Sequence, residues 1–82
     1  MDIVIGSVVT AKAGRDKGGY FVVTGILEKG RVLICDGKRR KVQHPKEKNI
    51  IHLQATNSVA PTISTNREIR KYLKTFMEGE YV

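Results

Sequence analysis

The chain has 82 residues, and its 15 lysine and arginine side chains against 8 aspartate and glutamate give a formal net charge of +7. A chain this short forms one small domain that buries only about 60% of the surface exposed on unfolding, which argues against a large catalytic pocket. The charge favours a polyanionic partner such as nucleic acid, with solubility alone as the alternative. No membrane-spanning run or secretory signal is visible, so we expect a cytoplasmic protein with no membrane partner.

The single cysteine, Cys35, can form neither an internal disulfide nor a zinc cluster, and we expect it to be a small buried apolar side chain. Together with His44 and His52 it does not make a metal site, and no pair of carboxylates stands out. A cysteine–histidine dyad would also need an orienting group and a pocket. We therefore expect no metal, no cofactor and no enzymatic activity.

Stiff β-branched residues dominate the first two thirds of the chain, since valine and isoleucine number 17 and leucine only 4. Strands are predicted over 7–12, 20–27, 31–35 and 38–42, followed at 49–53 by a fifth strand or a 3₁₀ turn leading into one. Gly25 inside the second run predicts a bend or bulge. Asp36-Gly37, between the third and fourth runs, predicts a type I′ hairpin turn. This spacing is typical of a small all-β barrel.

Residues 55–65 carry no charge and include Pro61, so they are predicted to be a linker between a barrel over 1–54 and a helix over 66–78. Thr65 and Glu68 form a capping-box pattern at the start of this helix, and Gly79 would end it. Its apolar stripe consists of Ile69, Tyr72, Leu73 and Phe76. The stripe needs a surface, which could belong to the chain's own barrel, to a second copy or to another protein.

The densest basic stretch contains Lys38, Arg39, Arg40, Lys41, Lys46 and Lys48, against the single acid Glu47. Such a cluster can neutralise several phosphates, although charge on an edge strand can also serve to prevent aggregation. Four adjacent charges exceed what edge protection needs, so phosphate binding is favoured.

A second basic segment is the glycine-rich loop over 13–19, with Lys12, Arg15 and Lys17 as its cations. Gly18 and its neighbouring glycines would let backbone N–H groups join these cations around a phosphate, but a simple tight loop explains the pattern equally well. Neither of the glycine-rich nucleotide-binding signatures occurs here.

Few aromatic side chains are available to stack on bases, so we expect recognition of phosphate and shape rather than of base sequence. Phe21 and Phe76 are predicted to be core residues. Tyr20 is either a stacking residue beside the glycine-rich loop or an ordinary surface tyrosine. The helix cations Arg67, Arg70, Lys71 and Lys74 share one side and could extend an RNA surface, but a solvated helix face is the favoured interpretation.

Residues 9–23, with the string Lys12-Ala-Gly-Arg-Asp-Lys-Gly18, resemble a KOW motif of small bacterial RNA-binding proteins similar to the archaeal and eukaryotic large-subunit ribosomal protein fourteen-e. A second block, Arg39-Arg40-Lys41-Val42 followed by residues 48–53, fits the same group. The resemblance covers residues 6–54 and no family motif matches 55–82. It implies an SH3-like barrel in which residues 15–18 shape the ligand surface and the basic run grips the phosphate backbone.

The sequence therefore predicts a mostly β protein, an SH3-like barrel with a C-terminal helix, that binds folded RNA in association with translation, with ribosomal RNA as the expected target. The alternative is a protein-interaction module in a transcription or ribosome-assembly complex, with the helix docking on a transcription or ribosome component. The expected partners besides RNA are the ribosome or another translation component. The predicted RNA-binding residues are Lys12, Arg15, Lys17, Gly18, Tyr20, Lys38, Arg39, Arg40, Lys41, Lys46 and Lys48.

Overall fold

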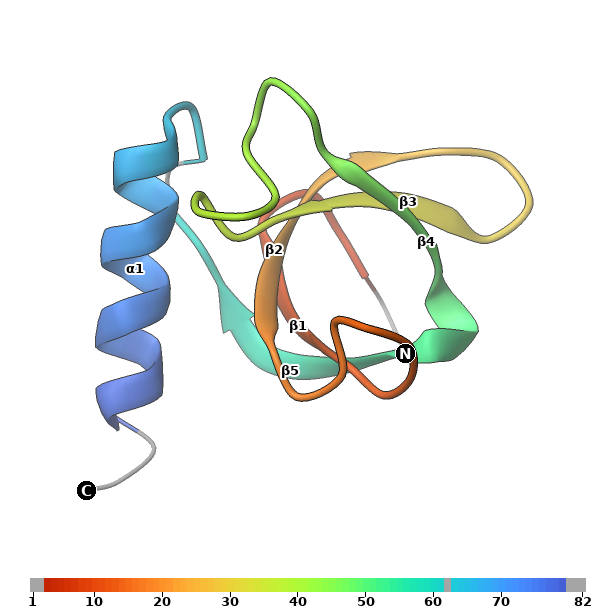
Figure 1. Cartoon of the computed structure of the whole chain (residues 1–82), viewed down its shortest axis with the longest axis horizontal. Helices are drawn as coiled ribbons and strands as arrows, with labels where there is room; N and C mark the ends of the chain where they lie inside the picture. Colours follow the sequence, from red (N-terminus) through yellow and green to blue (C-terminus); the bar gives the residue numbers. More distant parts are fainter. Residues whose placement is uncertain (1–2, 62, 80–82) are drawn as a thin grey trace.

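The structure is a computed structural model that describes residues 3–61 and 63–79, without the side chains of residues 77–79. Its elements in chain order are β1 (Ser7–Ala11), β2 (Tyr20–Ile26), β3 (Arg31–Cys35), β4 (Lys46–Asn49), the 3₁₀ turn η1 (Ile50–His52), β5 (Leu53–Val59) and α1 (Asn66–Gly79). The five strands form one antiparallel sheet in the order β4-β3-β2-β1-β5, which curls into a barrel with α1 on its outside (Figure 1). The prediction of an SH3-like barrel with a C-terminal helix is confirmed.

The sheet bends where the sequence places Gly25. The register of β2 against β3 shifts between Val23 and Gly25, and a Cβ atom at Gly25 would lie only 2.9 Å from the Leu33 Cδ1 atom. A side chain at this position would crowd the paired Leu33 side chain, so glycine eases the packing at the bend. The predicted bulge is confirmed.

Successive side chains of β1 and β2 point to opposite faces of the sheet and so build two cores. Val9, Phe21 and Val23 pack inside the barrel with Ala11, Val32, Ile34 and Leu53. Val8 and Val22 point outward, where they pack with Cys35, Ala60, Ile69 and Leu73 under the helix. Phe21 is a core residue, as predicted.

Cys35 is fully buried, which confirms the sequence interpretation. Burial raises the pKa of its thiol, with the Thr24 hydroxyl acting in the opposite direction and nearby Asp36 adding to the increase. The thiol donates a hydrogen bond to the Lys41 carbonyl oxygen over 3.5 Å. It thereby holds the backbone of the following loop against β3.

The helix α1 begins with the predicted capping box. The Glu68 N–H donates to the Thr65 hydroxyl over 3.1 Å, and the Glu68 carboxylate accepts from the Thr65 N–H over the same distance. The apolar stripe lies on the chain's own barrel, since Ile69 and Leu73 are buried there and Tyr72 and Phe76 are partly buried beside them. Of the three surfaces considered for the stripe, it is the chain's own barrel that the stripe contacts. Within the described ranges, no helix is long and apolar enough to cross a bilayer.

Two predicted elements differ from the structure by more than a residue at their ends. Residues 38–42 are not a strand but part of a loop over 36–45, and the fourth strand is Lys46–Asn49. The Asp36 carboxylate closes residues 36–40 into a turn through the N–H groups of Lys38 and Arg40, whereas 46–49 pairs with β3 through its backbone as an edge strand. The predicted linker over 55–65 begins as strand β5, which pairs with β1 as far as Val59.

Candidate nucleic-acid interface

The two predicted basic segments lie at the same end of the β2–β3 hairpin. The glycine-rich loop (residues 13–19, preceded by Lys12) leads into the start of β2, and the basic loop (residues 36–45) leaves the end of β3. Because β2 and β3 are antiparallel, these two points are neighbours, while the turn over 27–30 lies at the opposite end. Folding therefore brings together segments that are about twenty residues apart in the sequence.

The glycine-rich loop is closed by its own backbone. Gly14 and Gly18 have positive φ angles of 82° and 86°, whereas Gly19 does not. The N–H groups of Lys17, Gly18 and Gly19 donate to carbonyl oxygens of Gly14, Ala11 and Asp16. These amides, including that of Gly18, are therefore not available to a phosphate. What the loop offers is the exposed side chains of Lys12, Arg15 and Lys17.

The basic loop is organised around the carboxylate of Asp36. One oxygen of Asp36 accepts hydrogen bonds from the N–H groups of Lys38 and Arg40, both over 2.9 Å. The Arg40 carbonyl in turn accepts from the N–H of Asp36 over 2.9 Å. Lys38, Arg39 and Lys41 are left exposed to solvent.

Arg40 is the exception in the basic run, because it pairs with an acid. Its guanidinium lies 3.2 Å from the Asp16 carboxylate, whose side chain is only 5% exposed. The ion pair joins the basic loop to the glycine-rich loop across 24 residues. Arg40 therefore has a structural role, in which it positions the exposed cations on both sides of it, and its contact with RNA stays a prediction.

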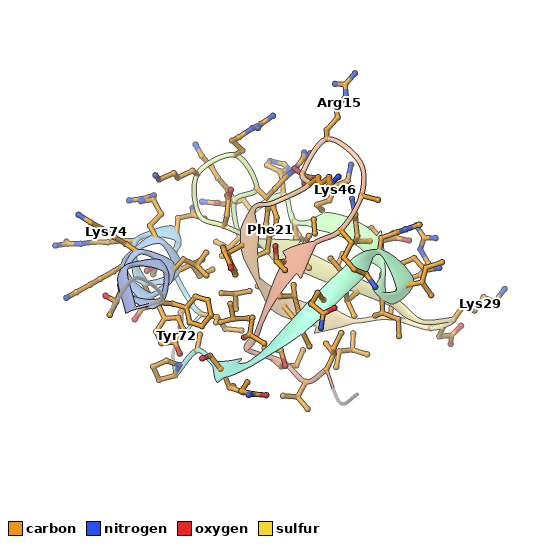
Figure 2. The ribbon with its side chains drawn as sticks, turned by 90° about the horizontal axis from the view of Figure 1, so that it is seen from below. Arg15, Phe21, Lys29, Lys46, Tyr72 and Lys74 are labelled. Carbon is orange, nitrogen blue, oxygen red and sulfur yellow. The ribbon has the colours of Figure 1, made fainter. Side chains whose placement is uncertain are left out.

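Lys46 and Lys48 of β4 lie on the same side of the molecule as the glycine-rich loop (Figure 2). The Lys48 ammonium donates to the Ala13 carbonyl oxygen over 3.3 Å and so also supports the glycine-rich loop. Figure 2 shows Arg15 projecting from the tip of this loop, with Lys46 beneath it and Lys29 far to the side. Lys48 thus has a partner within the protein, while Lys46 borders the exposed cluster.

Tyr20 does not lie free beside the glycine-rich loop. Its ring packs edge-on against Phe76 of α1, with ring centroids 5.4 Å apart and an angle of 63° between the planes. Both rings belong to the core between sheet and helix. One edge of the Tyr20 ring therefore packs against the helix, and the role of this half-buried residue in stacking on a base stays a prediction.

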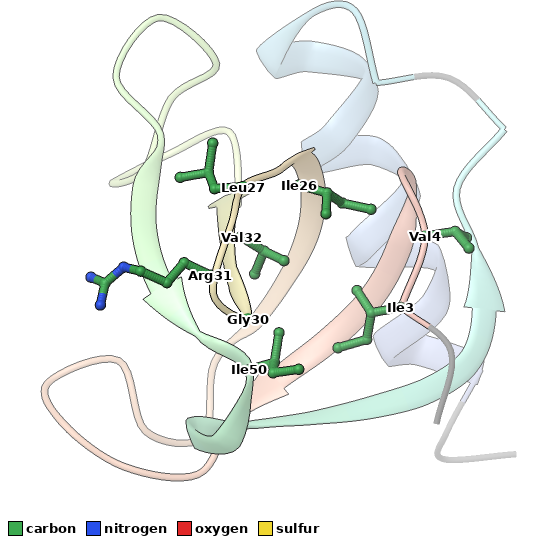
Figure 3. A pocket seen from close by; sticks show the side chains of 8 residues that line it. All are labelled: Ile3, Val4, Ile26, Leu27, Gly30, Arg31, Val32 and Ile50. Carbon is green, nitrogen blue, oxygen red and sulfur yellow. The ribbon is translucent and has the colours of Figure 1, made fainter.

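An apolar pocket that no sequence pattern predicted lies at the opposite end of the barrel (Figure 3). Its walls are Ile3, Val4, Ile26, Leu27, Val32 and Ile50, together with Gly30 and Arg31. Val4, Ile26 and Leu27 are 40–54% exposed. The guanidinium of Arg31 pairs with Glu47 on the neighbouring strand, so its charge is already matched by an acid. Among the described residues, no three potential metal ligands lie together.

The Asp16–Arg40 ion pair should contribute measurably to stability. We expect Asp16→Asn to lower the free energy of unfolding by about 1–2 kcal/mol, because a buried carboxylate that bonds a guanidinium is replaced by a neutral amide. The matched control is Glu47→Gln, which breaks the exposed Arg31 pair and should cost well under about 1 kcal/mol. Urea denaturation measures both, and equal losses would contradict the structural role of Asp16.

Fold and surface together define a small cationic β-barrel protein with a helix packed on its outer face. No family model matches the chain. It is 33% identical over 63 residues to the putative ribosome-binding protein YbzG of Bacillus subtilis (strain 168), covering 77% of this chain and 85% of the relative. The chain belongs to the family of YbzG.

Proposed function

We propose that this protein associates with the ribosome in the cytoplasm by binding folded ribosomal RNA through phosphate contacts, as a KOW-type barrel with no chemistry of its own. The observation that carries the proposal is the gathering of exposed cations at one end of the barrel. They are Lys12, Arg15, Lys17, Lys38, Arg39 and Lys41, and none of them forms an ion pair with a described residue. The name of the relative YbzG supports the ribosome as the place of binding.

The basic loop is held in place before any ligand binds. The Asp36 carboxylate, the Cys35 thiol and the Asp16 carboxylate each hold one part of it. A loop that is already ordered loses little conformational entropy on binding, so more of the electrostatic attraction appears as affinity. This favours a specific binding surface over charge that serves solubility alone.

The aromatic side chains indicate that the surface reads phosphates rather than bases. Phe21 is inside the barrel, Tyr20 and Phe76 pack on each other, and the Tyr72 hydroxyl donates to the Val59 carbonyl oxygen. Tyr81 lies outside the described residues. Single-stranded RNA is usually held by stacking on exposed rings, whereas double-helical RNA is recognised by shape and backbone. The surface therefore suits double-helical segments of folded RNA.

A salt series tests the electrostatic mechanism. With about five phosphate contacts, the affinity for a labelled RNA hairpin should fall roughly 10²- to 10³-fold between about 50 and 200 mM KCl. Fluorescence anisotropy gives this dependence directly, and a single-stranded oligonucleotide of the same length serves as the comparison. An affinity that does not change with salt would rule the mechanism out.

The apolar pocket favours a second candidate function, a protein-interaction module. Exposed apolar side chains that line a hollow are common at protein-binding surfaces. The helix stripe, first considered for this role, lies on the barrel instead. On this view, removing the cations of the basic loop would leave a complex with a ribosomal protein intact.

A further inference from the structure

The helix α1 presents a row of cations on the side away from the barrel. Arg67, Arg70, Lys71 and Lys74 follow one another at intervals of three, one and three residues, and all four are exposed. At 1.5 Å per residue the row is about 10 Å long. Arg67 with Lys71 and Arg70 with Lys74 are like charges four residues apart, an arrangement that slightly destabilises a helix by itself. A bound polyanion would remove this cost.

Three hydrogen bonds attach the first turns of α1 to the basic loop. The Arg70 guanidinium donates to the Gly37 carbonyl oxygen over 2.8 Å. The Asn66 side chain accepts from the Val42 N–H over 2.8 Å and donates to the Gln43 side chain over 2.9 Å. The row of cations on the helix therefore has a fixed position relative to Lys38, Arg39 and Lys41. The sequence did not point to Asn66, since its partners lie more than twenty residues away.

The described acidic side chains of the glycine-rich loop, the basic loop and α1 all have partners within the protein. Asp16 pairs with Arg40, Asp36 accepts backbone hydrogen bonds within the basic loop, and Glu68 is engaged in the capping box. Figure 2 shows the basic loop lying between α1, with Lys74 pointing outward from it, and the loop that carries Arg15. A cationic surface thus runs from the glycine-rich loop across the basic loop to the helix.

We propose that the cationic side of α1 is part of the RNA-binding surface, so that one double-helical RNA contacts the basic loop and the helix together. This rests on the proposed function and extends it, because it assigns a role to the residues that follow the barrel. Arg70 positions the helix against Gly37, while Arg67, Lys71 and Lys74 contact phosphates. The earlier interpretation of a merely solvated face did not include the attachment to the basic loop.

The test uses the full chain and a fluorescein-labelled RNA hairpin with a stem of about 16 base pairs, titrated at several KCl concentrations. The variant Lys71→Gln/Lys74→Gln removes two cations and keeps good helix-forming residues. We expect it to bind at least about tenfold more weakly near 0.1 M salt, with a salt slope lower by nearly 2, about 0.9 for each lost contact. Lys71→Arg/Lys74→Arg should retain affinity, and Lys29→Gln, at the distant turn, should have little effect.

Three other results of this experiment would contradict either this inference or the proposed function. Unchanged affinity in the Lys71/Lys74 double variant, together with weakened binding after removal of the cations of the basic loop, would overturn this inference and leave the proposed function standing. If Lys29→Gln weakened binding as much as Lys71→Gln alone, net charge rather than a defined surface would be responsible, which also overturns it. A wild-type chain that shows no salt-dependent binding to the hairpin would remove the proposed function itself.

Discussion

Replacing Lys38, Arg39 and Lys41 together with glutamine should weaken binding to folded RNA by about 10²- to 10³-fold near 0.1 M salt, because three phosphate contacts with their counterion release are lost. The three side chains are exposed and form no ion pair with a described residue, so the folded state loses no attractive contact. We therefore expect the free energy of unfolding to stay within about 0.5 kcal/mol of the wild type. Anisotropy titration and urea denaturation measure the two quantities.

The control for this variant keeps the charge and changes the side chain. Lys38→Arg/Lys41→Arg should bind nearly as well as the wild type, because long-range attraction to phosphate depends mainly on charge. Binding by the glutamine variant that matched the wild type would show that the basic loop is not the RNA-binding surface. The apolar pocket would then become the leading candidate for the site.

Gly37→Ala should strongly lower the free energy of unfolding. Gly37 has a φ angle of 79°, and a Cβ atom there would lie 2.5 Å from the Asn66 carbonyl oxygen and 2.8 Å from the Arg70 Cγ atom. Alanine would carry the cost of a left-handed backbone, about 1–2 kcal/mol, and would also push the loop away from α1. We expect a total loss of about 3 kcal/mol in the free energy of unfolding, measured by urea denaturation.

Gly18→Ala separates these two effects. Gly18 has a φ angle of 86°, but a Cβ atom there would meet nothing within 4 Å. This variant should therefore lose only the backbone term, about 1–2 kcal/mol. If both variants lost the same stability, the contact between the basic loop and the helix would not matter to the fold.

Much of the fold could be predicted because local signals agree with tertiary packing. The first three strands begin at the expected residues and end at most one residue early, since alternating β-branched residues in β1 and β2 serve two buried faces. The capping box likewise marked the start of α1. Strand β4 was missed because Lys46–Asn49 is an edge strand paired through its backbone, with no apolar alternation to reveal it.

The Asp36-Gly37 pair shows how a correct local signal led to a wrong element. Gly37 does adopt a positive φ angle, and the Asp36 carboxylate does organise a turn. A hairpin was nevertheless the wrong conclusion, because the close approach of α1, not a partner strand, requires glycine at this position.

The candidate surface could be predicted as a set of cations but not as an arrangement. Composition and spacing identified which side chains are basic. Only the fold shows that Arg40 is held by Asp16, that Lys48 supports the Ala13 carbonyl, and that Tyr20 lies beneath the helix. These are contacts between residues far apart in the chain, and no local pattern encodes them.

The second core, between sheet and helix, makes α1 part of the same packed unit as the barrel. Val8, Val22 and Cys35 are completely shielded from water, and Ile69 and Leu73 of the helix are packed with them. A truncated chain that stopped after Val59 would expose this apolar outer face of the sheet to solvent, and such a chain would tend to associate or aggregate. We therefore expect the barrel to depend on α1 for its stability, so that a shortened version needs residues of both the sheet and the helix.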